Sequence, residues 1–168
     1  GIVALSLTTL GEGVFDDKDE VCYLVVSSKL TTINANAVSK SFTLYSTEEN
    51  DTAKSYAANN SSVYFMEIKP EMTVLSKPAE EIRAAVGDVV KLSVDVSINS
   101  VGGSSITSLV KHVGKEWKYS SDGGKTFVAF TSDVLQVPTV KAGNVICVCT
   151  LTDLDGTKQM IETVVHVG

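Results

Sequence analysis

A cluster of carboxylates near the start of the sequence is a first candidate for a metal-binding site. Four acidic residues surround Lys18 in one short stretch and could offer oxygen ligands to a hard cation such as Ca²⁺. They are Asp16, Asp17, Asp19 and Glu20. The stretch lacks the glycine and the closing glutamate that a calcium loop needs, so we favour a solvated connector.

Asp153 and Asp155 form a weaker candidate metal site. They lie two residues apart, just before Gly156, and could give two carboxylates and a carbonyl to a calcium ion. A hairpin turn prefers the same residues, because aspartate bonds to nearby backbone amides and glycine tolerates positive φ. We favour the turn.

Nucleophilic and redox chemistry would have to come from three cysteines and two histidines. Cys147 and Cys149 have one residue between them, whereas metal knuckles and redox pairs need two. His112 has no partner at ligand spacing, and no Ser/His/Asp or Cys/His arrangement includes His166. Glycine motifs for phosphate or dinucleotide binding are also absent from the sequence. We therefore expect no catalytic residues, no cofactor and no enzyme activity.

The cysteines also bear on the compartment in which the chain folds. Three cysteines cannot all pair within one chain, and two residues of an extended strand two positions apart are badly placed for a mutual disulfide. We expect Cys22, Cys147 and Cys149 to be buried free thiols that behave as small apolar groups. Free thiols suit a protein that folds in a reducing cytoplasm.

Composition and charge argue against nucleic acid and membranes as partners. The chain has 168 residues, of which 43% are hydrophobic, and a net charge of −6. Residues 1–72 hold ten acidic and five basic residues, residues 73–168 hold ten and nine, and the only arginine is Arg83. Binding to nucleic acid through clustered Lys and Arg is disfavoured. No apolar run approaches the ~20 residues of a membrane-spanning helix, so we expect no membrane insertion.

Periodicity predicts a small α+β domain over residues 1–70, mostly β with one short helix. Strands are expected at 2–10, 21–26, 41–45 and 63–68, with a weak strand within 29–40. Ser46 and Glu49 have capping-box spacing and predict a helix over residues 47–58. A domain boundary is expected near residues 69–77, which Pro70 and Pro78 bracket.

Residues 71–168 are predicted to form a β-sandwich. Period-two alternation over 89–97 places Val90, Leu92, Val94 and Val96 on one strand face. The segment 116–127 predicts a hairpin that turns at Asp122-Gly123 and carries the only tryptophan, Trp117. A second hairpin is expected from residues 145–152 and 157–167. The long segment 99–114 is the best candidate for a contact surface.

This second half resembles the Ig-like domains of bacterial surface proteins and phage virion proteins over residues 73–168. The resemblance rests on Trp117, on the Cys-x-x-Thr-Asp-x-Asp-Gly hairpin from Cys149 and on the Val86-Gly87-Asp88 turn upstream. It implies an antiparallel sandwich with the tryptophan between its sheets. Cys149 matches the family's second cysteine, but the strand at 89–96 lacks the first. The expected core residues are Trp117, Tyr119, Leu92, Val94, Cys149 and Leu151.

The expected function is a structural one with protein partners. The leading hypothesis is a phage virion protein that decorates the capsid or tail, assembled in the host cytoplasm, with an N-terminal docking unit and a projecting Ig-like domain. The start at Gly1 shows no basic segment of a secretion signal, which favours it. The alternative is an exported bacterial cell-surface or adhesion module.

A carbohydrate-binding sandwich is a further alternative. It would need Tyr119, Phe127 and Phe130 to be exposed on one sheet face. Self-association, the role of the segment at 99–114 and the identity of the partner stay open at this point.

Overall fold

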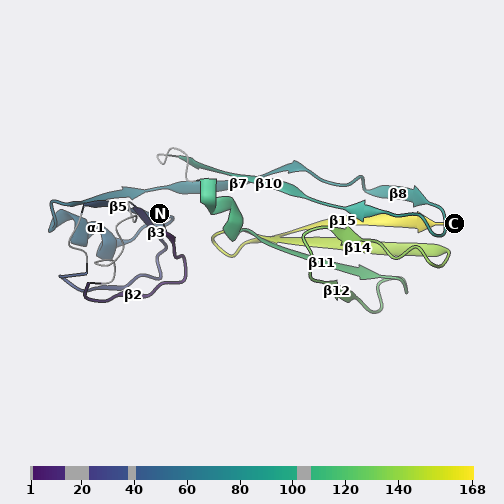
Figure 1. Ribbon diagram of the computed structural model, residues 1–168, viewed down its shortest axis with the longest axis horizontal. Coiled ribbons are helices and arrows are strands. Elements are labelled where there is room, and N and C mark those ends of the chain that lie inside the picture. Colours follow the sequence, from purple (N-terminus) through teal and green to yellow (C-terminus); the bar gives the residue numbers. More distant parts are fainter. Residues whose placement is uncertain (1, 14–22, 38–40, 102–106) are drawn as a thin grey trace. The chain divides into compact units, whose positions relative to one another are not determined.

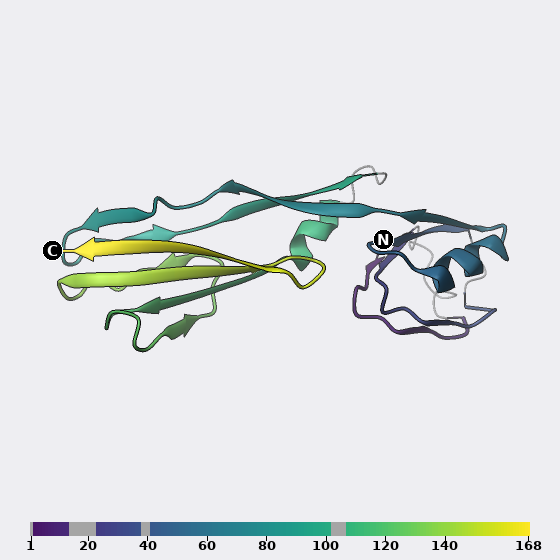
Figure 2. The ribbon, with the colours of Figure 1, turned by 180° about the vertical axis from the view of Figure 1, so that it is seen from behind.

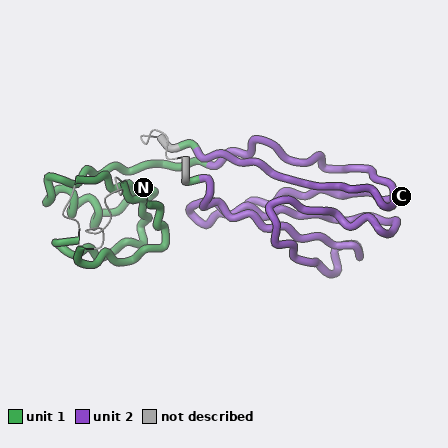
Figure 3. The backbone as a smooth tube through the Cα atoms, in the orientation of Figure 1, with its two compact units in different colours: residues 1–71, 99–109 green, residues 72–98, 110–168 purple. Residues whose placement is uncertain are grey.

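The computed structural model describes residues 2–13, 23–37, 41–101 and 107–168, and its ribbon is drawn in Figure 1. The chain is mainly β, which confirms the predicted fold class. It has two compact units (Figure 3): unit 1 comprises residues 1–71 and 99–109, and unit 2 comprises residues 72–98 and 110–168. The segment 99–109 therefore belongs with unit 1, although residues 72–98 of the other unit precede it in sequence.

Unit 1 is built on a four-stranded sheet in the order β1-β3-β5-β6, in which every neighbouring pair is parallel. The strands are β1 (Ile2–Val3), β3 (Tyr23–Val26), β5 (Phe42–Ser46) and β6 (Val63–Glu67). A separate parallel pair joins β2 (Thr9–Leu10) to β4 (Thr32–Ile33). Parallel neighbours need crossover connections, and the helix supplies one of them between β5 and β6.

One continuous strand over residues 2–10 was a wrong prediction. The chain leaves the sheet after Val3 because Leu7 N–H donates to the Ala4 carbonyl oxygen at 3.2 Å, which closes a turn. β1 and β2 consequently join different sheets.

The helix α1 (Asp51–Ala58) begins later than the capping-box spacing predicts. Asn50 is its N-cap, and the Asn50 side-chain oxygen accepts from Ala53 N–H at 2.9 Å. Ser46 instead ends β5, where its hydroxyl donates to the Glu48 carbonyl oxygen at 2.5 Å. The capping box is therefore a wrong prediction, because pairing of Ser46 with Val26 in the sheet holds it away from the helix start.

α1 covers one face of this sheet and closes the core of unit 1 (Figure 2). Ala53 and Tyr56 of the helix pack with inward-facing strand residues in a single buried cluster. The members of that cluster from β3, β5 and β6 are Leu24, Val26, Phe42, Leu44 and Val63. The opposite face of the sheet contributes none of the members.

Unit 2 contains a five-stranded sheet in the order β12-β11-β14-β15-β8. Its strands are β8 (Glu81–Ala84), β11 (Gly114–Ser120), β12 (Val128–Phe130), β14 (Gly143–Thr152) and β15 (Lys158–Val167). β14 and β15 pair in antiparallel fashion along their whole length, and they run side by side in Figures 1 and 2. The edge strand β8 pairs with β15 in parallel fashion, an exception to the antiparallel prediction.

The second layer of unit 2 consists of short strand pairs. β9 (Lys91–Leu92) pairs with β13 (Leu135–Gln136), and β7 (Lys69–Ser76) pairs with β10 (Asp95–Val101). Residues 69–71 of β7 and 99–101 of β10 are assigned to unit 1, and the rest of both strands to unit 2. Residues of β9 and β13 share one buried cluster with residues of β11, β14 and β15, so the two layers pack face to face. This arrangement of strands is that of an Ig-like β-sandwich.

Two predicted boundaries in unit 2 were wrong. The alternating segment 89–97 is split between β9 and β10, although the alternation of buried and exposed side chains persists: Leu92 and Val94 are buried, and Lys91 and Ser93 are exposed. The segment 99–114 is not one loop, because β10 extends to Val101 and a 3-10 helix, η1 (Thr107–His112), follows.

Candidate interaction surfaces

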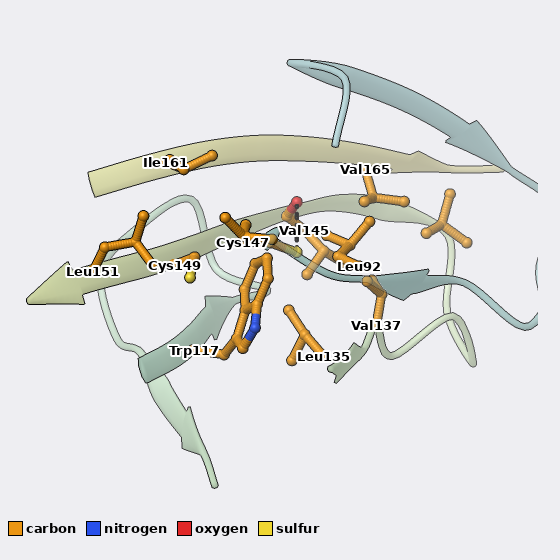
Figure 4. Packing of buried hydrophobic residues seen from close by; sticks show 12 residues of the cluster. Leu92, Trp117, Leu135, Val137, Val145, Cys147, Cys149, Leu151, Ile161 and Val165 are labelled. Carbon is orange, nitrogen blue, oxygen red and sulfur yellow. Dashed lines mark hydrogen bonds between the residues drawn. The ribbon is translucent and has the colours of Figure 1, made fainter. Parts of the chain in front are cut away.

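The interior of unit 2 is organised around Trp117 on β11. The side chain is only 2% exposed, and its Nε1–H donates to the Asp133 carbonyl oxygen at 2.9 Å. In the strand register Trp117 pairs with Phe130 on one side and Cys149 on the other. Figure 4 shows its indole ring beside Leu135. The residues Leu92, Val94, Cys149 and Leu151 belong to the same buried cluster, and Tyr119 packs against it partly buried.

The two described cysteines are free, buried thiols on β14. Burial raises the pKa of Cys147 to about 12. Burial also raises the pKa of Cys149 to about 11, an effect that the nearby charge of Lys115 partly offsets. Because only a thiolate is nucleophilic, these thiols are chemically inert near neutral pH. Cys22 lies outside the described residues.

Asp153 and Asp155 shape the turn between β14 and β15. Leu154 N–H donates to Asp153 Oδ1 at 2.6 Å, and Thr157 N–H donates to Asp155 Oδ1 at 2.9 Å. Hydrogen bonds from Thr157 hold the pKa of Asp155 below its usual range. Among the described residues no group of three or more His, Cys, Asp or Glu could hold a metal ion. The acidic stretch Asp16–Glu20 falls outside the described part.

The hairpin between β11 and β12 is closed by a network around Asp122. Thr126 donates to the Asp122 carboxylate from its hydroxyl and from its N–H, the latter at 2.9 Å, and the Ser120 hydroxyl donates to it at 2.7 Å. These bonds, those from Thr126 first, lower the pKa of Asp122 to about 2. Gly123 and Gly124 both have positive φ, 76° and 90°, which explains why glycine occupies both positions.

The aromatic residues expected of a sugar-binding face do not form one. Tyr119 and Phe130 are partly buried and pack against the core of unit 2. Phe127 is 40% exposed, and the Lys118 ammonium lies 4.7 Å from the centroid of its ring. Phe127 is therefore the most exposed of the three rings, and Lys118 covers one of its faces.

The described hydrogen bonds of the histidines involve no nucleophilic side chain. His166 on β15 has Nδ1 at 2.8 Å from Asn144 Oδ1 and Nε2 at 3.4 Å from Glu81 Oε1. These contacts join β14, β15 and β8 at the exposed side of the sheet. His112 is exposed at the end of η1. Neither arrangement has the geometry of a catalytic base beside a nucleophile.

The segment at 99–114 offers little apolar contact surface where it is described. Leu109 is fully buried, and Val110 and Val113 are partly buried. Residues 102–106 lie outside the described part. The exposed side chains of η1 include Lys111 and His112.

Sequence periodicity did not reveal an apolar patch at one end of unit 2. Val86, Val89 and Val140 are 52%, 73% and 87% exposed. Their loops are tied together, because Gly87 N–H donates to the Thr139 carbonyl oxygen at 2.9 Å and the Thr139 hydroxyl donates to the Asp88 carbonyl oxygen at 2.6 Å. These three exposed valines, on two loops that hydrogen bonds join, form a candidate contact point of modest size.

A second surface missed by the sequence lies on unit 1. The sheet face opposite α1 presents two rows of side chains in register across its strands. One row is Tyr23, Thr43 and Tyr64, and the other is Val3, Val25, Tyr45 and Met66. We call these residues the tyrosine face. Its tyrosines come from three different strands, so no local motif could have indicated it.

No protein-family model matches the chain, and no curated protein matches it by sequence. None of the helices in the described residues is long and apolar enough to cross a membrane.

Solved structures give only distant similarities. Three N-terminal domains of the Highly Immunogenic Outer Capsid protein (Hoc) of bacteriophage RB49 are 10% identical, with a TM-score of 0.33, over 62% of this chain and 31% of that one. Immunoglobulin domains 1–4 of Sidekick-1 are 13% identical, with a TM-score of 0.36, over 63% of this chain and 26% of that one. CopC from Methylosinus trichosporium OB3b is 15% identical, with a TM-score of 0.35, over 58% of this chain and 93% of that one. The Ig-like class of unit 2 therefore rests on its own strand topology and core.

Proposed function

We propose that this chain is a non-enzymatic structural protein of a phage particle, in which unit 1 docks onto the capsid or tail and unit 2 is displayed. The observation that carries the proposal is the core of unit 2. An Ig-like sandwich is completed there by Trp117, by Leu92 and by free thiols at Cys147 and Cys149. A core of this kind needs no oxidising compartment, which suits a virion part that folds in the host cytoplasm.

The arrangement of polar groups supports a binding role over a catalytic one. The strongly perturbed thiols are buried and protonated, and the perturbed carboxylate of Asp122 is engaged in a turn. Perturbed groups of these kinds maintain structure, whereas an active site needs them in a cleft beside a reacting atom. Exposed apolar side chains are available for protein contacts, namely Tyr64 on unit 1 and Val86, Val89 and Val140 on unit 2.

Fractionation of the natural source tests the proposal. Virus particles are banded on a density gradient, and the chain is identified by intact mass after alkylation in denaturant without reductant. We expect it in the particle band with all three cysteines alkylated. Recovery from the cell envelope or medium, a lipid-modified start or a disulfide would refute the proposal and favour an exported surface module.

A further inference from the structure

An apolar groove opens beside the two hydrogen-bonded loops of unit 2. Its volume is about 380 Å³. Its apolar lining residues are Val89, Phe130, Val137, Pro138 and Val140. Val137 is only 3% exposed and belongs to the buried core (Figure 4), whereas Val89 and Val140 are 73% and 87% exposed. Exposed valines therefore flank a groove whose base is continuous with the core of unit 2.

The groove is already formed in the free chain. Thr139 joins the two loops, since its carbonyl oxygen accepts from Gly87 N–H at 2.9 Å and its hydroxyl donates to the Asp88 carbonyl oxygen at 2.6 Å. Nearby, Val137 N–H donates to the Val90 carbonyl oxygen at 2.9 Å. A site that exists before its ligand arrives loses less entropy on binding.

The lining of the groove suits an aromatic side chain with a polar tip. Pockets of roughly 300–1,000 Å³ that are mostly apolar and have a few polar groups are typical binding sites for small organic groups. Gln136 also lines this groove, and its amide can form a hydrogen bond with a hydroxyl group. Tyrosine combines a large apolar ring with a hydroxyl that needs such a partner when it is buried. Binding energy also concentrates on tyrosine in many interfaces.

Unit 1 presents one side chain of this kind. Tyr64 lies on β6, which is an edge strand of its sheet, and is 63% exposed. No other large hydrophobic side chain in the described part of unit 1 is exposed. Tyr64 is therefore the natural candidate for an aromatic anchor on that unit.

Basic residues outnumber acidic ones around the groove. Lys141 directly follows the lining residue Val140, and Lys91 pairs in register with the lining residue Gln136. Both lysines are exposed. Asp88 lines the groove as well, but its carboxylate already accepts a hydrogen bond from a backbone N–H at 2.8 Å. The rim of the groove thus favours a partner surface with negative charge.

Opposite net charges select the surface that enters the groove. Segments 83–91 and 137–141 carry three basic residues and one acidic residue, whereas residues 1–72 carry five basic and ten acidic residues. Two grooves that faced each other would bring like charges together. A groove that faces unit 1 of another copy brings opposite charges together. Charge complementarity therefore favours Tyr64, on the acidic unit, as the occupant.

We infer that the groove of unit 2 binds Tyr64 of a second copy of this chain. The ring packs between Val89 and Val140, and the hydroxyl bonds to the Gln136 amide. The two surfaces differ, so the contact is heterologous. The contact is small, and association in solution is accordingly weak. It does not depend on the proposed function, although copies displayed on one particle would associate more strongly because their effective concentration is higher.

Sedimentation velocity of the purified full chain under reducing conditions tests this contact. The chain is measured from about 10 μM to about 1 mM, the range of weak complexes. We expect reversible association, which Tyr64→Ala and the double variant Val89→Ser/Val140→Ser each weaken by at least about tenfold. The matched control is Met160→Ala, which truncates a 68% exposed side chain of unit 2 that does not line the groove. It should associate as the wild type does, and all variants should keep the wild-type thermal midpoint.

A mixture of the two weakened variants gives the sharpest result. Tyr64→Ala keeps an intact groove, and the double valine variant keeps Tyr64. Their equimolar mixture should therefore form one-to-one dimers with about the wild-type affinity, because one complete contact is restored. Mixing would not repair a merely structural defect in either variant.

Three results would overturn the inference or part of it. A wild-type chain that stays monomeric at about 1 mM overturns the second copy as the occupant. Wild-type affinity in either weakened variant, or a mixture that associates no better than its components, overturns the contact between Tyr64 and the groove. Association that does not weaken as salt is raised overturns the role of the charges, since salt screens them. None of these results bears on the fractionation experiment, which tests the proposed function separately.

Discussion

Asn50 offers the sharpest test of how unit 1 is held together. Its side chain is 93% buried and makes three hydrogen bonds. The amide group donates to the carbonyl oxygens of Ser27 and Leu30, at 2.9 Å each, and the amide oxygen caps α1 by accepting from Ala53 N–H at 2.9 Å. Asn50 thus ties the start of the helix to the segment that follows β3.

Two substitutions separate these roles. Asn50→Ser keeps an oxygen suited to capping but removes the amide, so it loses two bonds worth roughly 1 kcal/mol each, about 2 kcal/mol in all. Asn50→Ala also loses the cap, worth about 1 kcal/mol more, for a total of about 3 kcal/mol. The matched control is Asn59→Ala at the C-cap of the same helix. The Asn59 amide makes one exposed bond, to the Ser55 carbonyl oxygen at 3.0 Å, and its loss should cost about 0.5 kcal/mol or less.

The assay must report on unit 1, whereas the only tryptophan lies in unit 2. Amide hydrogen exchange measured by mass spectrometry on a peptide that covers α1 meets this need. We expect protection to fall by about 30-fold in Asn50→Ser and about 150-fold in Asn50→Ala. Exchange in Asn50→Ser equal to the wild type would refute the role of the two amide bonds. Equal exchange in the two variants would refute the role of the cap.

Three further predictions concern buried or perturbed groups. Because burial raises the pKa of Cys147 from 9.0 to about 12, the unfolded thiol ionises first as pH rises. Stability should be full below about pH 9 and then fall by about 1.4 kcal/mol per pH unit for this thiol, and Cys147→Ala should flatten the fall in urea unfolding. Asp122 has a pKa lowered from 3.8 to about 2, so its contribution to the hairpin should hold above that range and disappear as pH falls through it. Thr126→Val should raise the Asp122 pKa in an NMR titration, and an unchanged pKa would refute the network. The buried Tyr56 hydroxyl has no hydrogen-bond partner in the described structure, so Tyr56→Phe should leave the thermal midpoint unchanged or raise stability by up to about 1 kcal/mol. A clear loss of stability in that variant would show that the Tyr56 hydroxyl does make a stabilising hydrogen bond.

The strands and turns of unit 2 could be predicted from the sequence, because they depend on local patterns of turn residues and alternating side chains. The strand at Trp117 turns at Asp122 and Gly123 as the turn residues predict, although the return strand begins at Val128 and not at Lys125. Alternation also placed Leu92 and Val94 on the buried side of their segment. The alternation of buried and exposed side chains continues through the gap between β9 and β10. An extended backbone keeps this alternation even where strand pairing is interrupted.

The strands and helix start of unit 1 were harder to predict, because they depend on contacts between segments that are distant in sequence. Ser46 and Glu49 satisfy the capping-box spacing, but Ser46 is taken up by pairing with Val26, and Asn50 becomes the cap. Parallel pairing joins strands that are about twenty residues apart, and no turn motif marks such a connection.

The candidate functional features likewise fall into those that follow from the sequence alone and those that depend on the tertiary structure. The absence of recognisable catalytic motifs and the acidic charge of residues 1–72 are properties of the sequence itself, because they follow from residue types and short spacings. The tyrosine face exists only in the folded chain, because Tyr23, Tyr45 and Tyr64 reach one surface through the register of three parallel strands. A shift of one residue in any of these strands would turn its tyrosine toward the core. Residue types and short spacings therefore determined which catalytic motifs the sequence does not contain, while long-range strand register decided which side chains share one sheet face.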